Sequence, residues 1–209
     1  MTVHDGFGLY AILTNPVVGF DYLTRLLVDC SVRFIQLRMK EAPIDEVRRV
    51  ALSMRSITEG SDSLFFLNDD PTLAREVGAD GVHLGQDDMS YDRARAIVGP
   101  DALIGISTHN LTQTRTACAL LPAYVGVGPV FPTPTKKMPD PVIGLDGMGA
   151  MIAHATVPAV AIGGIDLSNL PQVLKAGARN YWMVRQINAS EKPQHVLSEA
   201  QRIFNDLRW

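Results

Sequence analysis

Polar side chains alternate with apolar ones in the stretch QLRMK, which closes an apolar run of the sequence. Successive side chains of a β-strand point to opposite faces, so Gln36, Arg38 and Lys40 are expected to share one face at the end of a buried strand. A buried cation needs an anionic partner, because an unpaired buried charge is costly. Taken alone, the two cations are more readily explained by solvation or by pairing with Glu41, so the rest of the chain has to decide.

Two carboxylates follow neighbouring apolar runs. Asp69 comes directly after one run and Asp88 shortly after the next, so both are expected at the same edge of a sheet. Two hard oxygen ligands suit Mg²⁺, which keeps several waters and takes phosphate oxygens. An aspartate before Pro71 could instead cap a helix, and we expect Asp70 to be that cap and Asp69 to be a metal ligand. His83 is expected to be a core histidine bonded to backbone, since imidazole is a poor partner for Mg²⁺.

Two further segments carry residue types that bind phosphate. Gly163 and Gly164 follow an apolar run, and glycines let backbone N–H groups approach a phosphate, although a tight turn explains such a pair equally well. Thr133, Thr135 and Lys136 lie in a long, proline-stiffened loop. Two hydroxyls at alternate positions beside a lysine would form a phosphate clamp, and the alternative is a solvated loop.

Arg185 adds a fourth candidate cation to Arg38, Lys40 and Lys136. With a Mg²⁺ site, this is too much positive charge for one neutral ligand, and a substrate with a diphosphate, or two phosphates, would balance it. Two unit charges at ~4 Å in a partly wet site interact by roughly 4 kcal/mol, so several such pairs could stabilise a departing diphosphate. The sequence shows no evident pair of a nucleophile and a base.

Apolar runs typical of strands alternate with helical patterns along the whole chain. The expected strands are 9–13, 32–38, 64–67, 81–84, 103–106, 124–127, 159–162 and 181–184, and each is followed by a helix, the last over about 193–207. Asp21 and Asn110 are expected as helix N-caps. Fully apolar strands joined by crossover helices indicate a parallel sheet covered on its outer face. Eight such units predict a (β/α)8 TIM barrel as a single domain over 1–209, with its site at the C-terminal ends of the strands; the runner-up is an open doubly wound sheet.

Composition narrows the function classes. The chain has 209 residues, 46% of them hydrophobic, and a formal net charge of −3, which argues against a nucleic-acid binder held by bulk charge. The start, MTVHDGFG, does not resemble a signal peptide, and no run of eighteen apolar residues predicts a membrane span. Cys30 and Cys118 show no pairing or metal spacing, so we expect a cytoplasmic enzyme. Oligomeric state is not predicted.

Several motifs together resemble the thiamine phosphate synthase family over nearly the whole chain. The most specific are VHLGQDD and GPVFPTPTKK, supported by QLRMK, GISTH and AIGGI. The resemblance implies a transferase that joins an aminopyrimidine methyl diphosphate to a thiazole phosphate and releases pyrophosphate, with Mg²⁺ as cofactor. In this family the pyrimidine ring is thought to expel pyrophosphate first, and the thiazole nitrogen then captures the resulting cation.

The resemblance also implies roles for individual residues. The pyrophosphate would be held by Gln36, Arg38, Lys40 and Asn68, and Mg²⁺ would be bound by Asp69 and Asp88. Ser107 would lie beside the pyrimidine, and Gly164 would offer its N–H to the thiazole phosphate. A mobile lid would bring Thr133, Thr135 and Lys136 into contact with phosphate and leaving group. Arg38, Lys40 and Lys136 are the predicted catalytic residues.

The end of the last strand departs from the family pattern, which is usually Ser and Ala before an Ile. Here Arg185 and Gln186 stand in those places. Our hypothesis is that Arg185 contacts the acceptor's phosphate, and the rival is that it alters the pocket for another acceptor. Two other functions stay open: a thiazole tautomerase, in which His109 could act, and a non-catalytic barrel that binds a phosphate ligand.

Overall fold

Eight parallel strands close into a barrel in the computed structural model, which describes residues 5–133 and 140–207. The strands pair in chain order, and β8 closes the ring against β1, where Tyr10 lies opposite Trp182. Their bounds are β1 Gly8–Leu13, β2 Phe34–Leu37, β3 Leu64–Asn68, β4 Gly81–Leu84, β5 Leu103–Thr108, β6 Tyr124–Val127, β7 Ala159–Ala161 and β8 Asn180–Met183. The predicted (β/α)8 barrel is therefore confirmed, and the open sheet was wrong.

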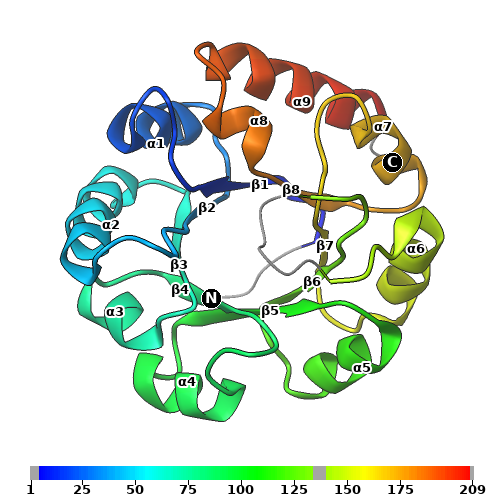
Figure 1. Ribbon diagram of the computed structural model, residues 1–209, viewed down its shortest axis with the longest axis horizontal. Helices are drawn as coiled ribbons and strands as arrows, with labels where there is room; N and C mark the ends of the chain where they lie inside the picture. The colour runs from blue at the N-terminus through cyan, green and yellow to red at the C-terminus, as the bar shows by residue number, and fades with distance from the viewer. Residues whose placement is uncertain (1–4, 134–139, 208–209) are drawn as a thin grey trace.

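Helices surround the barrel on its outside, as Figure 1 shows. They are α1 Phe20–Asp29, α2 Ile44–Thr58, α3 Pro71–Glu76, α4 Tyr91–Val98, α5 Leu111–Ala119, α6 Gly144–His154, α7 Leu170–Lys175, α8 Arg185–Asn188 and α9 Pro193–Leu207. All eight predicted helices are present, and α8 is an extra short helix that the sequence did not predict. No helix of the described residues is long and apolar enough to cross a membrane.

Two of the three predicted helix caps are confirmed. The side chains of Asp70 and Asn110 accept hydrogen bonds from backbone N–H groups in the first turns of α3 and α5. The predicted cap Asp21 was wrong, because α1 begins one residue earlier, at Phe20, and Gly19 takes the cap position with a φ of 84°. Asp21 instead lies in the first turn and accepts a hydrogen bond of 2.7 Å from the hydroxyl of Ser53.

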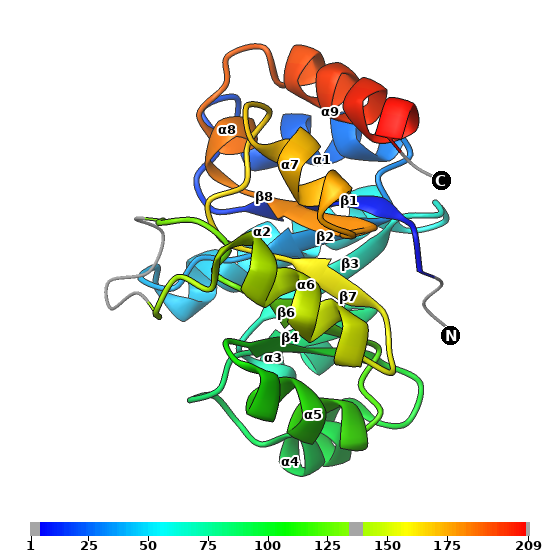
Figure 2. The ribbon, with the colours of Figure 1, turned by 90° about the vertical axis from the view of Figure 1, so that its right-hand side faces the viewer.

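The strand side chains divide between two apolar layers. Alternate residues point outward and pack against the helices, while the others fill the barrel interior. The interior layer consists mainly of Tyr10, Ile12, Phe34, Phe66, Tyr124, Val160 and Ile162. Because this layer packs the interior, we expect a ligand site at the end of the barrel rather than along its axis. The loops after β6 and β7 project from the same side of the barrel (Figure 2), which is the side where the strands end.

Candidate active site

A cavity of about 180 Å³ lies at the C-terminal ends of the strands, within the described part of the chain. Nine of the predicted site residues line it: Arg38, Lys40, Asn68, Asp69, Asp88, Ser107, Thr133, Gly164 and Arg185. Thr135 and Lys136 lie outside the described residues. The structure thus brings together side chains that are separated by up to 147 residues in the sequence (from Arg38 to Arg185).

An acidic pair lies at the mouth beside a lysine. Asp69 Oδ2 is 2.9 Å from Lys40 Nζ, and the carboxyl of Asp88 is close enough to hydrogen-bond that of Asp69. Burial is the main reason that the pKa of Asp69 rises to about 6; Asp88 raises it further and Lys40 opposes the change. Two carboxylates held this closely repel each other unless a proton or a cation lies between them. The pair therefore fits a divalent cation.

The backbone fixes both carboxylates. Asp69 adopts a φ of 66°, a conformation that is uncommon for a residue with a side chain and often marks functional sites. Its N–H donates to the carbonyl of His83 at 2.8 Å, which ties it to the neighbouring strand. Asp88 Oδ2 accepts a hydrogen bond of 2.6 Å from the N–H of Gly85. Both side chains are thus positioned before any ligand arrives.

Within residues 5–133 and 140–207, no cluster of three or more His, Cys, Asp or Glu side chains could hold a metal ion by itself. Mg²⁺ often takes only one or two carboxylates from the protein and completes its shell with water and phosphate oxygens. Asp69 and Asp88 match that smaller set.

Arg38 is half-buried behind the acidic pair. Desolvation lowers the pKa of its guanidinium, while the charges of Asp69 and Asp88 partly offset that effect. The ordinary pKa of a guanidinium lies so far above neutrality that Arg38 remains a cation at neutral pH. An anion that enters the mouth would meet a positive charge already stripped of much of its water, where electrostatic attraction is stronger than in bulk solvent.

Gln36 lies beneath the cavity rather than on its wall. Its side chain is fully buried, and it is absent from the lining residues. Gln36 Nε2 donates to Asn68 Oδ1 at 2.8 Å, and its Oε1 accepts from the hydroxyl of Tyr10 at the same distance. The geometry gives Gln36 a positioning role toward Asn68, whereas its direct contact with pyrophosphate stays a prediction.

His83 is a buried, neutral histidine, but its partners are side chains rather than the predicted backbone groups. Nδ1 lies 2.9 Å from the hydroxyl of Tyr124, and Nε2 lies 2.8 Å from Ser107 Oγ. This is a hydroxyl–imidazole pair, which the sequence analysis did not anticipate. A phenol, however, faces Nδ1 where catalytic triads have a carboxylate, and burial lowers the pKa of His83 to about 3. The imidazole is therefore too weak a base to activate Ser107 as a nucleophile near neutral pH.

The glycine turn after β7 has a packing reason. Gly163 and Gly164 have φ values of 89° and 69°. A Cβ on Gly163 would lie 2.4 Å from Cβ of Pro129, and one on Gly164 would lie 2.7 Å from Cβ of Phe131. Only glycine fits this close approach of the two loops. The turn that the sequence left as an alternative is thus present, and the contact between Gly164 N–H and a phosphate stays a prediction.

His109 lies on the pocket wall beside the loop after β6. Its Nδ1 is 2.7 Å from the carbonyl of Gly128, and its Nε2 is 3.4 Å from Asp140 Oδ2. Because a carbonyl can only accept, Nδ1 carries the proton in this arrangement. His109 therefore links the end of β5 to both ends of the loop that contains the Pro/Thr segment.

With this geometry in view, comparison with known proteins decides the family. Residues 10–187 match the family described as thiamine monophosphate synthase. The chain belongs to this family. The resemblance seen in the motifs VHLGQDD and GPVFPTPTKK is confirmed, because the match covers both motifs and seven of the eight strands completely.

Individual proteins of the thiamine monophosphate synthase family are similar to this chain over most of its length. A thiamine-phosphate synthase of Gloeobacter violaceus is 48% identical over 182 residues, which are 87% of this chain and 53% of that protein. One of Lawsonia intracellularis is 34% identical over 201 residues, which are 94% and 92% of the two chains. A solved thiamine phosphate pyrophosphorylase from Pyrococcus furiosus superimposes with a TM-score of 0.88 at 30% identity, over 98% of both chains. The chain thus spans about half of the first protein and nearly all of the other two.

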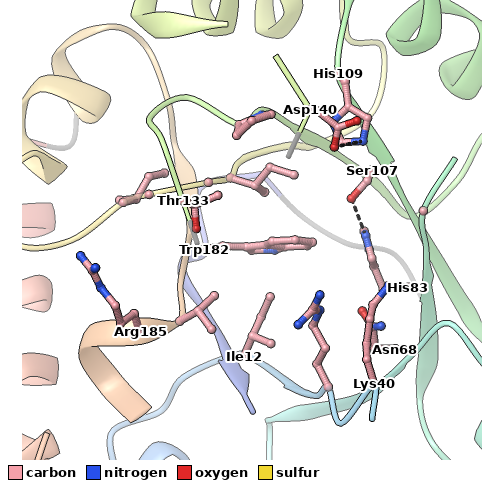
Figure 3. A pocket seen from close by; sticks show the side chains of 18 of the residues that line it. Ile12, Lys40, Asn68, His83, Ser107, His109, Thr133, Asp140, Trp182 and Arg185 are labelled. Atoms are coloured by element: carbon pink, nitrogen blue, oxygen red, sulfur yellow. Dashed lines mark hydrogen bonds and ion pairs between the residues drawn. The ribbon is translucent and has the colours of Figure 1, made fainter. Parts of the chain in front are cut away.

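Trp182 is one of the pocket residues that the sequence did not predict. Figure 3 shows it crossing the pocket between Arg185 on one side and His83 on the other. Its ring meets that of His83 edge-on, with centroids 4.8 Å apart and an interplanar angle of 75°. Its Nε1 is buried and has no hydrogen-bond partner among the described residues. The signal was available: alternation along β8 sends Tyr181 and Met183 outward and therefore Trp182 inward.

Arg185 and Gln186 begin the unpredicted helix α8. Arg185 is exposed and lines the pocket on the side opposite His83 (Figure 3). Gln186 Oε1 accepts a hydrogen bond of 2.8 Å from the N–H of Leu167, so α8 is tied to the loop before α7. The two residues that depart from the family pattern thus both line the pocket, and Gln186 connects α8 to the segment that follows Gly164.

Proposed function

We propose that this chain is a thiamine phosphate synthase, which couples an aminopyrimidine methyl diphosphate to a thiazole phosphate and releases pyrophosphate. The observation that carries the proposal is the meeting of Arg38, Lys40 and Asn68 with the paired carboxylates of Asp69 and Asp88 at one pocket. Such a set suits a diphosphate leaving group with a divalent cation. Membership of the thiamine monophosphate synthase family supports the same reaction.

Asp69 and Asp88 would hold Mg²⁺, and when bound the ion would neutralise charge that develops on the diphosphate. Arg38 and Lys40 would bind diphosphate oxygens and stabilise them as the bond to the pyrimidine methylene breaks, and Asn68 would donate to a further oxygen. Lys40 would exchange its contact with Asp69 for the substrate. Thr133, and Thr135 and Lys136 outside the described residues, would contact the leaving group from the loop after β6.

A dissociative reaction suits this pocket. The barrier is lowered by stabilising a leaving group, so the chain needs cations and N–H donors more than it needs a strong base. Burial keeps His83 neutral. The reaction does not require its partner Ser107 to act as a nucleophile. The thiazole nitrogen of the acceptor would then capture the pyrimidine cation, with the acceptor's phosphate held by Gly164 N–H and Arg185.

The experiment is a two-substrate assay. Purified protein is incubated with both phosphorylated substrates, with and without Mg²⁺, and thiamine phosphate and pyrophosphate are measured. Both products should form only when the two substrates and Mg²⁺ are present together. Binding of both substrates without product would contradict the proposal and favour a non-catalytic ligand-binding barrel.

The alternative function is a thiazole tautomerase, favoured by one observation: His109 lines the pocket with a nearby carboxylate, Asp140. Isomerisation of a thiazole phosphate without release of pyrophosphate would support it against the synthase.

We also propose a reducing, cytoplasmic location, since Cys30 and Cys118 are both free thiols.

A further inference from the structure

A continuous line of hydrogen bonds runs through the barrel interior beneath the pocket. It joins Ser107, His83, Tyr124, Tyr10, Gln36 and Asn68 in that order, with heavy-atom distances of 2.8 or 2.9 Å at each of its five steps. The four inner members are buried, and the two end members, Ser107 and Asn68, line the pocket together with His83. The direction of the hydrogen bond at one end of the line therefore determines the direction of the hydrogen bond at the other end.

The end near Asn68 sets the direction of this line. Gln36 Nε2 donates to Asn68 Oδ1, and the hydroxyl of Tyr10 donates to Gln36 Oε1. A phenol has a single proton, so once Tyr10 has donated it, its oxygen can only accept. The oxygen of Tyr124, 2.9 Å away, must then be the donor to Tyr10.

Counting the protons of each group in the same way gives the direction of the remaining hydrogen bonds, as far as Ser107. Tyr124 has used its one proton, so its oxygen accepts from Nδ1–H of His83. A neutral imidazole carries one N–H, and His83 is neutral here because its ring is buried and both ring nitrogens face uncharged hydroxyls, which would leave an imidazolium charge unpaired. Nε2 is therefore unprotonated and accepts from the hydroxyl of Ser107. All five hydrogen bonds point the same way, from Ser107 toward Asn68.

We propose that this one-way line fixes which hydrogen-bonding groups the pocket offers: lone pairs from Ser107 Oγ at one end and an amide NH₂ from Asn68 at the other. Resting on the proposed function, it positions the substrate with its ring amino group donating to Ser107 and its diphosphate oxygens accepting from Asn68. Tyr10, Tyr124, His83 and Gln36 are positioning residues in this scheme.

The assignment agrees with the charges around each end. Asn68 adjoins Asp69 in sequence and shares the pocket with Arg38 and Lys40, where diphosphate oxygens, which only accept, are expected. A substrate bound the other way round would set its amino group against the NH₂ of Asn68 and its oxygens against lone pairs of Ser107. Unmatched groups of this kind cost more than a good hydrogen bond gains. The inner residues of the line thus orient the substrate through the two end residues, Ser107 and Asn68.

The first test reads the proton on His83 directly. Two-dimensional ¹⁵N–¹H spectra of the protein distinguish Nδ1–H from Nε2–H imidazole, and the His83→Gln variant identifies the signals. The proposal predicts Nδ1–H in the protein without ligand. An Nε2–H tautomer would mean that the line runs in the opposite direction and would overturn the proposal, whether or not the chain proves to be a synthase.

The second test interrupts the line at its middle with Tyr10→Phe. The hydroxyl of Tyr124 is then released to donate to His83 Nδ1, and the proton should move to Nε2, facing Ser107. The matched control is Tyr181→Phe, which removes the hydroxyl of another buried tyrosine that faces the helices; this hydroxyl donates to the carbonyl of Ala200 at 3.5 Å. The control should keep the wild-type tautomer. An unchanged tautomer in Tyr10→Phe would contradict the proposal.

Binding gives the functional readout. Calorimetry without acceptor compares the aminopyrimidine diphosphate with an analogue that has hydrogen in place of the ring amino group. The wild type and Tyr181→Phe should prefer the amino compound by about tenfold, the effect of one hydrogen bond, and Tyr10→Phe should lose most of that preference. Equal preference in Tyr10→Phe and the control would overturn the positioning role. If the wild-type protein binds neither compound, the synthase proposal is contradicted. The tautomer measurement would still test the direction of the hydrogen bonds independently.

Discussion

The two sides of the pocket are built differently. The side that we propose for the leaving group has Arg38, Lys40, Asn68, Asp69 and Asp88, at or just after the ends of β2, β3 and β4; it is called the leaving-group side below. The side that we propose for the acceptor has Gly164, from the turn after β7, Trp182 of β8 and Arg185 at the start of α8; it is called the acceptor side below. On the leaving-group side the carboxylates, the lysine and the amide are held by hydrogen bonds or ion pairs within the protein. The acceptor side presents an exposed arginine and an indole N–H without a partner among the described residues.

This difference indicates where the chain is prepared in advance and where it awaits a ligand. Electrostatic stabilisation of a leaving group works best when the charges are fixed beforehand, since no reorganisation is then needed as the bond breaks. The indole N–H of Trp182 is buried without a partner, and such a group destabilises a protein by about 1–3 kcal/mol. The acceptor side is also where this chain departs from the family pattern, at Arg185 and Gln186. Substitutions on the two sides should therefore affect different steps.

The largest effect is expected on the leaving-group side, from Asp69→Ala and Asp88→Ala. Each removes a carboxylate of the proposed Mg²⁺ site, so the Mg²⁺-dependent rate should fall by about 10²-fold or more while thermal unfolding stays close to wild type. Steady-state rates at several Mg²⁺ concentrations measure this. Asp87→Ala is the matched control, because Asp87 is exposed and does not line the pocket. Wild-type Mg²⁺ dependence in Asp69→Ala would remove it from the metal site.

Arg38→Ala should follow, with a fall in kcat of about 10²-fold from lost stabilisation of the leaving group. Arg33→Ala is the control, since Arg33 precedes the same strand at its other end, where its guanidinium contacts the carbonyl of Asp62. Rates of pyrophosphate release at saturating substrates, measured for both variants, compare the effect of removing an arginine at each end of β2. If both arginines gave the same small loss, the leaving-group side would not depend on Arg38.

A smaller, different effect is expected on the acceptor side. If Arg185 contacts the acceptor's phosphate, Arg185→Ser should raise the KM for thiazole phosphate by about tenfold and leave the KM for the pyrimidine substrate unchanged. Arg179→Ser is the control, because Arg179 lies before β8, where it pairs with Asp5 at 3.5 Å. An unchanged or lower acceptor KM in Arg185→Ser would favour the rival hypothesis that Arg185 alters the pocket for another acceptor.

The smallest effect concerns stability, through His83 beneath the leaving-group side. Its pKa is lowered from 6.5 to about 3 in the folded chain, first by burial. Between these values the unfolded chain binds a proton that the folded chain does not, so the free energy of unfolding should fall as pH falls. His83→Gln removes this contribution and should flatten the slope by up to about 1.4 kcal/mol per pH unit. Urea unfolding between pH 4.5 and 6.5 measures it, and equal slopes would show that His83 is not held neutral.

The sequence predicted the parts of this molecule that depend on local patterns. Apolar runs and their spacing identified every strand, and residue types at strand ends predicted which side chains meet at one pocket, as Asp69 and Lys40 illustrate. It did not reveal what depends on packing across the barrel. The hydrogen-bonded line through Tyr10 and Tyr124 joins six strands, β1 to β6, and nothing in either tyrosine's neighbours along the chain indicates the other. Trp182 was overlooked because a large apolar residue in a strand is normally core.

The most direct test of the account is a crystal structure with inorganic diphosphate and Mg²⁺ added. The account predicts one diphosphate at the leaving-group side, with the metal between Asp69 and Asp88 and with Arg38 on a diphosphate oxygen. An empty leaving-group side at saturating ligand, or a diphosphate bound only beside Gly164 and Arg185, would contradict it.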